Sequence, residues 1–405
     1  MNGHEMTQRL LESWVESFYD YTNKLPSPQI FRRWAGISAV AGALERKTFL
    51  RTSQGPVYPN LYTFLCGPPG VGKTELTKRV RELLISLESH HVSASSVTGA
   101  ALVDELSEAD RTVIVPSKAT MMFNSLFVLS NELSTLLPGY DGEIMGVLTE
   151  MYDNNNYSQK RRGNKIDIQI AKPQFNLLAA TTPSYLNGLL PAGAWDQGFL
   201  SRTFVVYSGE EILVPMFDSQ LDDANYFDKL KTDLKTISEL TGEFKIEEEA
   251  KEALSNWHIN RKKSAPSHPK LAHYNTRRTM HLLKLSMIAS VSKSDKLVIQ
   301  LDEVQTAMNW LAEMEEYIPD VFKSMNMGGD SNAIKECWYF TYQLYLKKRE
   351  PVPATQIFTF LQERVPAHSV ERIVEVMVKS GILKKHSVNK IGDAYEPKPI
   401  RPDAM

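Results

Sequence analysis

The stretch Gly67-Pro68-Pro69-Gly70-Val71-Gly72-Lys73-Thr74 decides the fold of this chain. It matches the phosphate-binding pattern G-x-x-x-x-G-K-[ST] at every fixed position. A β-prone run, 61–66, precedes it and a helix-forming run, 74–84, follows it, which is the order that the motif requires. In that arrangement backbone N–H groups face the phosphates, Lys73 contacts the β- and γ-phosphates, and the Thr74 hydroxyl ligates Mg²⁺. The sequence therefore predicts an α/β core that binds ATP and Mg²⁺.

A second ATPase motif is expected at the end of a buried strand. The apolar run 125–129 predicts that strand, and Ser130-Asn131-Glu132 follows it. In phosphate-loop enzymes an acidic residue here holds Mg²⁺, and a glutamate beside it polarises the attacking water. Glu132 fits the glutamate, although a solvated acid after a strand would look the same. Asn131 replaces the usual aspartate, and we expect weaker magnesium binding because an amide adds no negative charge.

Two further sets of polar residues lie at the boundaries of predicted strands. The run 175–180 predicts a third core strand that ends at Thr181 and Thr182, which would bring a hydroxyl near the γ-phosphate. Arg202 stands directly before the β-rich run 203–207. At such a boundary an arginine can project from the domain surface.

A basic hairpin is predicted between the second and third core strands. Isoleucines alternate with polar residues over 166–170, and a Gly-Asn turn precedes them, which predicts paired strands. Four cations surround the turn: Lys160, Arg161, Arg162 and Lys165. They would meet a nucleic-acid phosphate backbone with little desolvation, whereas a basic tip can also serve solubility alone.

The C-terminal part of the chain is predicted to be helical, with one break. After residue 213 we expect only helices, one of which opens at Thr276-Arg277-Arg278, and then a flexible linker at 327–331. Three more helices and a two-stranded hairpin follow. The third helix mixes acidic and basic residues, so the better phosphate contacts are hairpin lysines, namely Lys384, Lys385 and Lys390. A protein-binding domain is the alternative.

Composition excludes several classes of protein. The 405 residues suffice for two or three domains, and hydrophobic residues at 42% with charged residues at 23% are typical of globular proteins. The net charge of -2 excludes a globally basic nucleic-acid binder. Two cysteines without zinc-finger spacing indicate a reducing compartment. No signal segment and no apolar run of about 18 residues is present, so we expect a cytoplasmic protein that is not bound to a membrane.

The order of these motifs resembles an AAA+ ATPase core. A basic hairpin at this place resembles the DNA-gripping hairpin of superfamily 3 and minichromosome-maintenance helicases, and residues 32–74 resemble helicase-like replication proteins of phages and plasmids. The resemblance implies a γ-phosphate sensor at Thr181 or Thr182, and an arginine finger at Arg202 that reaches a neighbouring subunit's ATP. It implies a second nucleotide sensor at Arg277, with Arg278 as its rival, and a C-terminal winged helix.

These expectations define five segments of the chain: an N-terminal helical segment 1–30, an AAA+ core 31–213, a helical lid 214–324, a linker 325–331 and a winged helix 332–405.

The expected function is an ATP-dependent DNA helicase or translocase of phage-type replication. It would act as a ring of six subunits on single-stranded or forked DNA, together with other replication proteins. If phage-encoded, it would act in the bacterial cytoplasm. One alternative is an AAA+ initiator or helicase loader that does not unwind DNA. Another is a regulatory or defence ATPase whose winged helix binds protein.

Overall fold

The computed structural model describes residues 9–94, 97, 99–114, 119–161, 166–189, 198–215, 223–266, 271–326, 330–362, 365, 367–388 and 392–398. The chain divides into two compact units, Met1–Val321 and Phe322–Met405. Each unit has its own buried core, and among the described residues the first unit contains three sheets and the second contains one.

The centre of the first unit is a five-stranded sheet in the order β4-β5-β8-β3-β9. Four strands are parallel, and β4 is antiparallel to β5 at one edge. Every residue of β3 and of β8 is buried, as expected for parallel strands covered by helices on both faces. The strands are β3 (Tyr62–Cys66), β4 (Asp110–Ile114), β5 (Thr120–Ser130), β8 (Pro173–Thr181) and β9 (Thr203–Tyr207).

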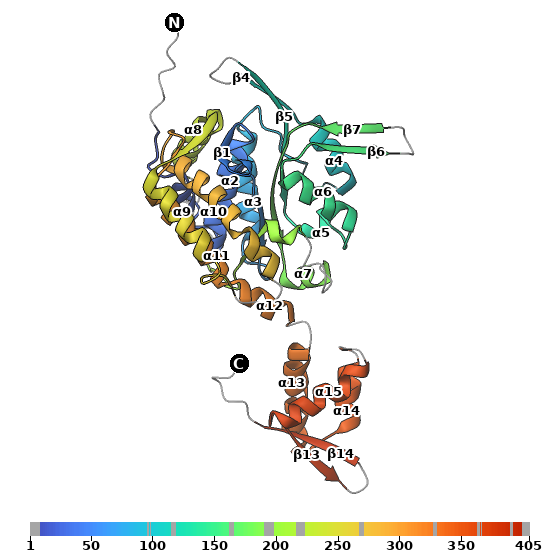
Figure 1. The fold of residues 1–405 in the computed structure, drawn as a ribbon. Helices are drawn as coiled ribbons and strands as arrows, with labels where there is room; N and C mark the ends of the chain where they lie inside the picture. The colour runs from blue at the N-terminus through green and yellow to red at the C-terminus, as the bar shows by residue number, and fades with distance from the viewer. Residues whose placement is uncertain are drawn as a thin grey trace. The chain divides into compact units, whose positions relative to one another are not determined.

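Helices on both sides of this sheet complete the core (Figure 1). Helix α2 begins at Gln29 and has Pro28 as its N-cap residue, without a side-chain capping hydrogen bond. It is buried along nearly its whole length, and the Ser38 hydroxyl donates to Thr63 Oγ1 of β3 at 3.0 Å. The helices from the N-terminus through α7, which follows β8, are α1 (Trp14–Tyr21), α2 (Gln29–Leu44), α3 (Lys73–Ile85), α4 (Gly99–Glu108), α5 (Leu133–Leu136), α6 (Gly142–Tyr152) and α7 (Pro183–Leu189).

A second sheet corrects one expectation. Its order is β11-β10-β1-β2, with β1 (Thr48–Thr52), β2 (Gly55–Val57), β10 (Gly242–Ile246) and β11 (Val298–Ile299). The segment after residue 213 is therefore not all helical, because β10 pairs in parallel with β1 and β11 pairs in parallel with β10. Short strands that pair with a distant strand leave no local pattern in the sequence. Strands β1 and β2 pair in an antiparallel hairpin.

The helices of this region are α8 (Ala224–Glu239), α9 (Glu248–Asn260), α10 (Ala272–Lys293) and α11 (Leu301–Glu316). They lie on the side of the first unit opposite α4 and α6 (Figure 1). Helix α10 docks on the core, where His281 Nε2 lies 3.0 Å from the Ser201 carbonyl oxygen. Arg277 lies inside α10 and does not open a helix, so that prediction was wrong.

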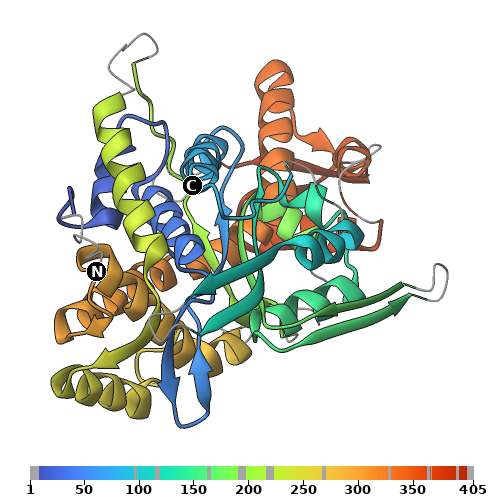
Figure 2. The ribbon, with the colours of Figure 1, turned by 90° about the horizontal axis from the view of Figure 1, so that it is seen from above.

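The predicted hairpin is a two-stranded ribbon, β6 (Tyr157–Arg161) and β7 (Ile166–Ile170). Figures 1 and 2 show it extending away from the body of the first unit. Asn154, which has a left-handed backbone with φ 57°, precedes it and donates its amide to Pro173 O and Gln174 Oε1, both at 3.1 Å. Arg162 and Lys165 lie outside the described residues, as do the side chains of Lys160 and Arg161.

The second unit contains the expected three helices and the hairpin. A short strand that we did not predict, β12, completes a three-stranded sheet in the order β12-β14-β13. Buried residues from all three helices, including Cys337, Ile357 and Met377, form its core. Helix α12 (Ile318–Asn326) spans the boundary between the units, and the second unit then holds α13 (Asp330–Lys348), β12 (Val352–Pro353), α14 (Ala354–Gln362), α15 (Ala367–Lys379), β13 (Leu383–Val388) and β14 (Gly392–Pro397). In the described part of the chain, no helix combines the length and apolar character needed to cross a membrane.

Candidate nucleotide site

The glycine loop joins β3 to α3 and is packed closely against two other segments. Gly72 has a left-handed backbone, with φ 68°, and a Cβ there would lie 2.0 Å from the Pro26 carbonyl oxygen. A Cβ on Gly67 would lie 2.4 Å from the Ser208 carbonyl oxygen. The Ser27 hydroxyl donates to Gly72 O at 2.7 Å. These two positions therefore require glycine, and residues 26–27 brace the loop, a contact that the sequence pattern did not reveal.

The loop forms one wall of a cavity of about 700 Å³ at the carboxyl edge of the central sheet. Because β3, β5 and β8 are parallel, the residues that follow them meet at this edge. The sequence predicted this meeting of the loop with residues after β5 and β8. The lining residues are Pro26, Pro69, Gly70, Val71, Gly72, Lys73, Thr74, Glu75, Asn131, Glu132, Leu133, Ser134, Ala180, Thr181, Thr182 and Tyr185.

Lys73 is held in place by the loop itself. Its Nζ donates to the carbonyl oxygens of Gly67 at 2.7 Å and Pro68 at 2.6 Å. Gly67 and Pro68 are not among the residues that line the cavity, and they contribute to the site through these backbone oxygens. Burial lowers the pKa of the Lys73 ammonium, against a smaller opposite effect of Cys66. A cation that is already partly desolvated gains strongly from contact with phosphate oxygens.

The Asn131 side chain is oriented by the phosphate-loop helix. Thr77 Oγ1, on α3, donates to Asn131 Oδ1 at 2.6 Å. The exposed Thr74 side chain lines the same cavity. A hydroxyl and an amide oxygen are hard donors of the kind Mg²⁺ accepts while it keeps most of its ligands as water and phosphate. The residues present therefore fit a magnesium–nucleotide complex, with Thr74 and Asn131 as the protein's contributions.

Glu132 and the two threonines complete the cavity. Glu132 is exposed and precedes α5, while its backbone oxygen accepts from the Ser130 hydroxyl at 2.7 Å. Thr182 Oγ1 accepts from the backbone N–H of Tyr185 at 3.3 Å and so caps α7. Thr181 is buried, and its carbonyl oxygen accepts from Gly67 N–H at 3.2 Å. Either hydroxyl remains a candidate γ-phosphate sensor.

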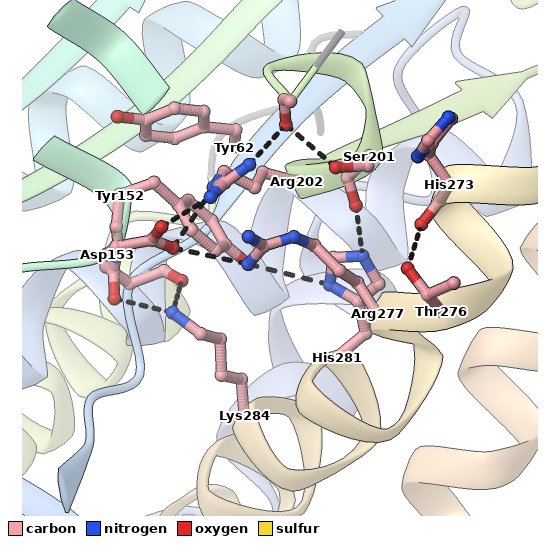
Figure 3. Close-up of polar contacts among 12 residues, drawn as sticks. Tyr62, Tyr152, Asp153, Ser201, Arg202, His273, Thr276, Arg277, His281 and Lys284 are labelled. Carbon is pink, nitrogen blue, oxygen red and sulfur yellow. Dashed lines mark hydrogen bonds and ion pairs between the residues drawn. The ribbon is translucent and has the colours of Figure 1, made fainter. Parts of the chain in front are cut away.

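Arg202 lies at the opposite edge of the sheet. It directly precedes β9, which is parallel to β3, and the five residues of β3, at about 3.3 Å each, separate the edges by about 16 Å. Its side chain is only 7% exposed. Nε donates to Asp153 Oδ1 at 3.0 Å, Nη2 donates to Asp153 Oδ2, and Nη1 donates to Gly198 O at 2.7 Å (Figure 3). The expectation that Arg202 projects from the surface was wrong, because the carboxylate of Asp153, which is distant only in the sequence, pairs with Arg202 inside the domain.

The two candidate second sensors have different partners. Arg277 Nη1 lies 3.2 Å from Asp153 Oδ1, so this arginine joins Arg202 at the amino edge of the sheet. Arg278 is buried and donates to both Glu315 carboxylate oxygens, at 2.7 and 2.6 Å. Among the described residues, neither arginine lines the cavity of its own chain. Arg278 instead joins α10 to α11.

Cations of the second unit are partly neutralised within its hairpin. Lys385 pairs with Asp393 at 2.7 Å, and His386 Nε2 lies 2.8 Å from a Glu396 carboxylate oxygen. Lys384 is exposed, and Lys390 lies outside the residues that the structure describes. The described part of the hairpin therefore presents a mixed surface to its surroundings.

Comparison with known proteins agrees with this geometry. Residues 62–193 match the family model of the AAA domain (dynein-related subfamily), a range that begins with β3 and includes the phosphate loop, β5, β8 and α7. A search of curated proteins found no match. The first unit thus contains an AAA-type P-loop ATPase domain, which supports ATP-dependent activity.

Proposed function

We propose that the chain hydrolyses ATP at a site shared between two copies and uses that hydrolysis to move DNA, as a ring-forming helicase or translocase. The observation that carries the proposal is the separation of the phosphate loop from Arg202. The loop lies at the carboxyl edge of the sheet, and Arg202 and Arg277 lie at the amino edge. One chain cannot bring these groups to a single nucleotide, whereas the facing edges of two copies can.

The residues of one cavity have separate tasks in this proposal. Lys73 binds the β- and γ-phosphates, and Glu132 orients the attacking water. Thr74 and Asn131 would hold Mg²⁺, which neutralises charge on the phosphate oxygens. A cation from the second copy then stabilises the charge that develops on the transferred phosphoryl group.

DNA binding is proposed for the β6–β7 ribbon. The ribbon extends from the ATPase domain (Figures 1 and 2), and its turn region carries Lys160, Arg161, Arg162 and Lys165. Four cations beside a Gly-Asn turn favour contacts with phosphates over contacts with bases. The ribbon, rather than the second unit, is therefore the proposed DNA grip.

The second unit is proposed to be a winged helix that docks on protein. Its element order, in which one helix, a short strand, two helices and a hairpin follow each other, supports the winged-helix assignment. The Lys385–Asp393 pair and the Glu375–Lys379 pair at 2.6 Å reduce the positive charge that a phosphate backbone would meet. This mixed charge favours a protein partner, such as another replication protein.

Strand displacement on forked DNA tests the proposal. The full chain should release a labelled strand with ATP, and Lys73→Ala should lose both ATP hydrolysis and displacement because the cation at the phosphates is gone. Hydrolysis without displacement would identify the loader or initiator alternative. ATPase activity that is unaffected by DNA of any form, together with no displacement, would contradict a DNA motor altogether.

A further inference from the structure

We propose that Asp153 is a positioning residue that holds Arg277 at the surface of one copy, where Arg277 contacts the terminal phosphate of the nucleotide bound by a second copy. Arg202 is then the inner support of this arrangement and not the contacting group. The inference rests on the proposed shared site and names the residues that complete it. Asp153, Arg202 and Arg277 are drawn together in Figure 3.

One carboxylate organises both arginines. Asp153 Oδ1 accepts from Arg202 Nε at 3.0 Å and from Arg277 Nη1 at 3.2 Å, while Oδ2 accepts from Arg202 Nη2. Arg202 therefore uses the two-pronged side of its guanidinium on Asp153, a geometry that fixes the plane of the group. Arg277 makes a single contact with the same carboxylate and keeps donors that can serve a phosphate.

Exposure distinguishes the two arginines. The side chain of Arg202 is 7% exposed, whereas those of Arg277 and Asp153 are 29% and 32% exposed. Arg202 would have to break a bidentate pair and a bond to Gly198 O before it reached another copy. Arg277 already lies at the surface, so contact with a second copy requires no such rearrangement.

Charge favours an anion at this position. Burial acts to raise the pKa of the Asp153 carboxyl, but Arg202, Arg277 and the more weakly acting Lys284 together outweigh it, so the pKa lies below its ordinary value. Asp153 is thus ionised at neutral pH, and its one negative charge faces two guanidinium groups. Within this trio one positive charge is left over, which a phosphate oxygen of the second copy would balance.

The groups around the trio are held by hydrogen bonds to partners other than Asp153. Asp153 follows α6 directly, and the hydroxyl of the preceding Tyr152 lies 3.5 Å from His281 Nδ1. Burial lowers the pKa of His281 to about 3, so at neutral pH its ring joins α10 to Ser201 without adding charge. Lys284 donates to Asn60 O at 3.0 Å and Asn60 Oδ1 at 2.6 Å, not to Asp153. Helix α10 therefore presents Arg277 from a rigid support.

Steady-state ATP hydrolysis by the full chain, with DNA present, tests these roles through three variants. Arg277→Ala should lower kcat by about 10³-fold or more, the loss seen when a transition-state arginine is removed. Asp153→Asn should lower kcat by about 10²-fold through misplacement of Arg277. In both variants KM for ATP should change little, because the cavity that binds ATP is intact. The matched control is Arg51→Ala, an exposed arginine that pairs with Glu243 on the other sheet, and it should keep the wild-type kcat.

Mixed assemblies separate a phosphate contact from a structural role. Lys73→Ala subunits carry a sound Arg277, and Arg277→Ala subunits carry a sound phosphate loop, so a mixture of the two should regain hydrolysis. Rescue of this kind is not expected from a variant that merely misfolds. Thermal unfolding shows whether Asp153→Asn folds. If it does not, the Arg277→Ala results decide the matter, because the Arg277 side chain is partly exposed and its removal should leave the fold intact.

Two outcomes would overturn the inference. One is a wild-type kcat in Arg277→Ala. The other is an equal or higher kcat in folded Asp153→Asn. If Arg202→Ala nevertheless loses hydrolysis and is rescued by Lys73→Ala subunits, the shared site stands and only the assignment of Arg277 fails. If hydrolysis by the wild type does not depend on protein concentration and both arginine variants are fully active, the shared site itself is refuted.

Discussion

The Thr77 hydroxyl donates to Asn131 Oδ1 at 2.6 Å and thereby joins the phosphate-loop helix to the end of β5. This bond fixes the amide where phosphate-loop ATPases commonly carry a carboxylate. Compared with a carboxylate, the amide would leave one formal negative charge fewer beside a bound Mg²⁺. Affinity for the metal should therefore be limited by residue 131.

Asn131→Asp should strengthen magnesium binding, because a carboxylate retains the acceptor for Thr77 and adds negative charge. The Mg²⁺ concentration for half-maximal ATP hydrolysis should fall by about tenfold, equivalent to about 1.4 kcal/mol. A magnesium titration at fixed ATP measures this, and Asn131→Ala should shift the midpoint in the opposite direction. An unchanged midpoint in Asn131→Asp would remove residue 131 from the metal site.

Glu132→Gln should bind ATP and hydrolyse it slowly. The substitution keeps the size of an exposed side chain but removes the base that orients water, a role worth about 10²- to 10⁴-fold in rate. ATP should still raise the unfolding temperature of the variant, by about as much as in the wild type. Normal turnover would remove Glu132 from the catalytic role.

Replacing Lys160, Arg161 and Arg162 together by alanine should weaken DNA binding without a change in sequence preference. If all three contact phosphates of single-stranded DNA, the slope of log K against log salt should decrease by about 2, at about 0.7 per contact. Basal ATP hydrolysis should persist, because the ribbon is separate from the cavity. A triple variant with an unchanged salt slope would leave the second unit as the DNA-binding candidate.

Glu45 should contribute to stability at neutral pH and lose that contribution in acid. Burial acts to raise the pKa of its carboxyl, but Lys47, His90 and Arg111 outweigh it and lower the pKa to about 2. A lowered folded-state pKa stabilises the fold above the unfolded value of about 4.3, and the effect fades as pH falls toward 2. Its size is on the order of 3 kcal/mol. Urea unfolding should show a smaller change between pH 7 and pH 3 for Glu45→Gln than for the wild type.

Local patterns in the sequence predicted the elements that depend on neighbouring residues. The glycine loop, the strand β5 before Asn131 and the β6–β7 ribbon are determined by motifs or periodicity within a few residues. Arg202 shows where such reasoning stops. Its partner Asp153 is 49 positions away in the sequence, and no spacing rule connects the two. The contact between Ser27 and Gly72 was missed for the same reason, as was the pairing of β10 with β1.

Only residues 154–156 separate Asp153 from β6, the first strand of the ribbon. Asn154 follows Asp153 and is held by Pro173 O and Gln174 Oε1 at the base of the ribbon, and β6 begins at Tyr157. A displacement of Asp153 would pivot the ribbon about this base, and a strand of five residues is a lever arm of about 16 Å. In an assembly completed by Arg277, the ribbon of each copy would follow the nucleotide of its neighbour and not its own.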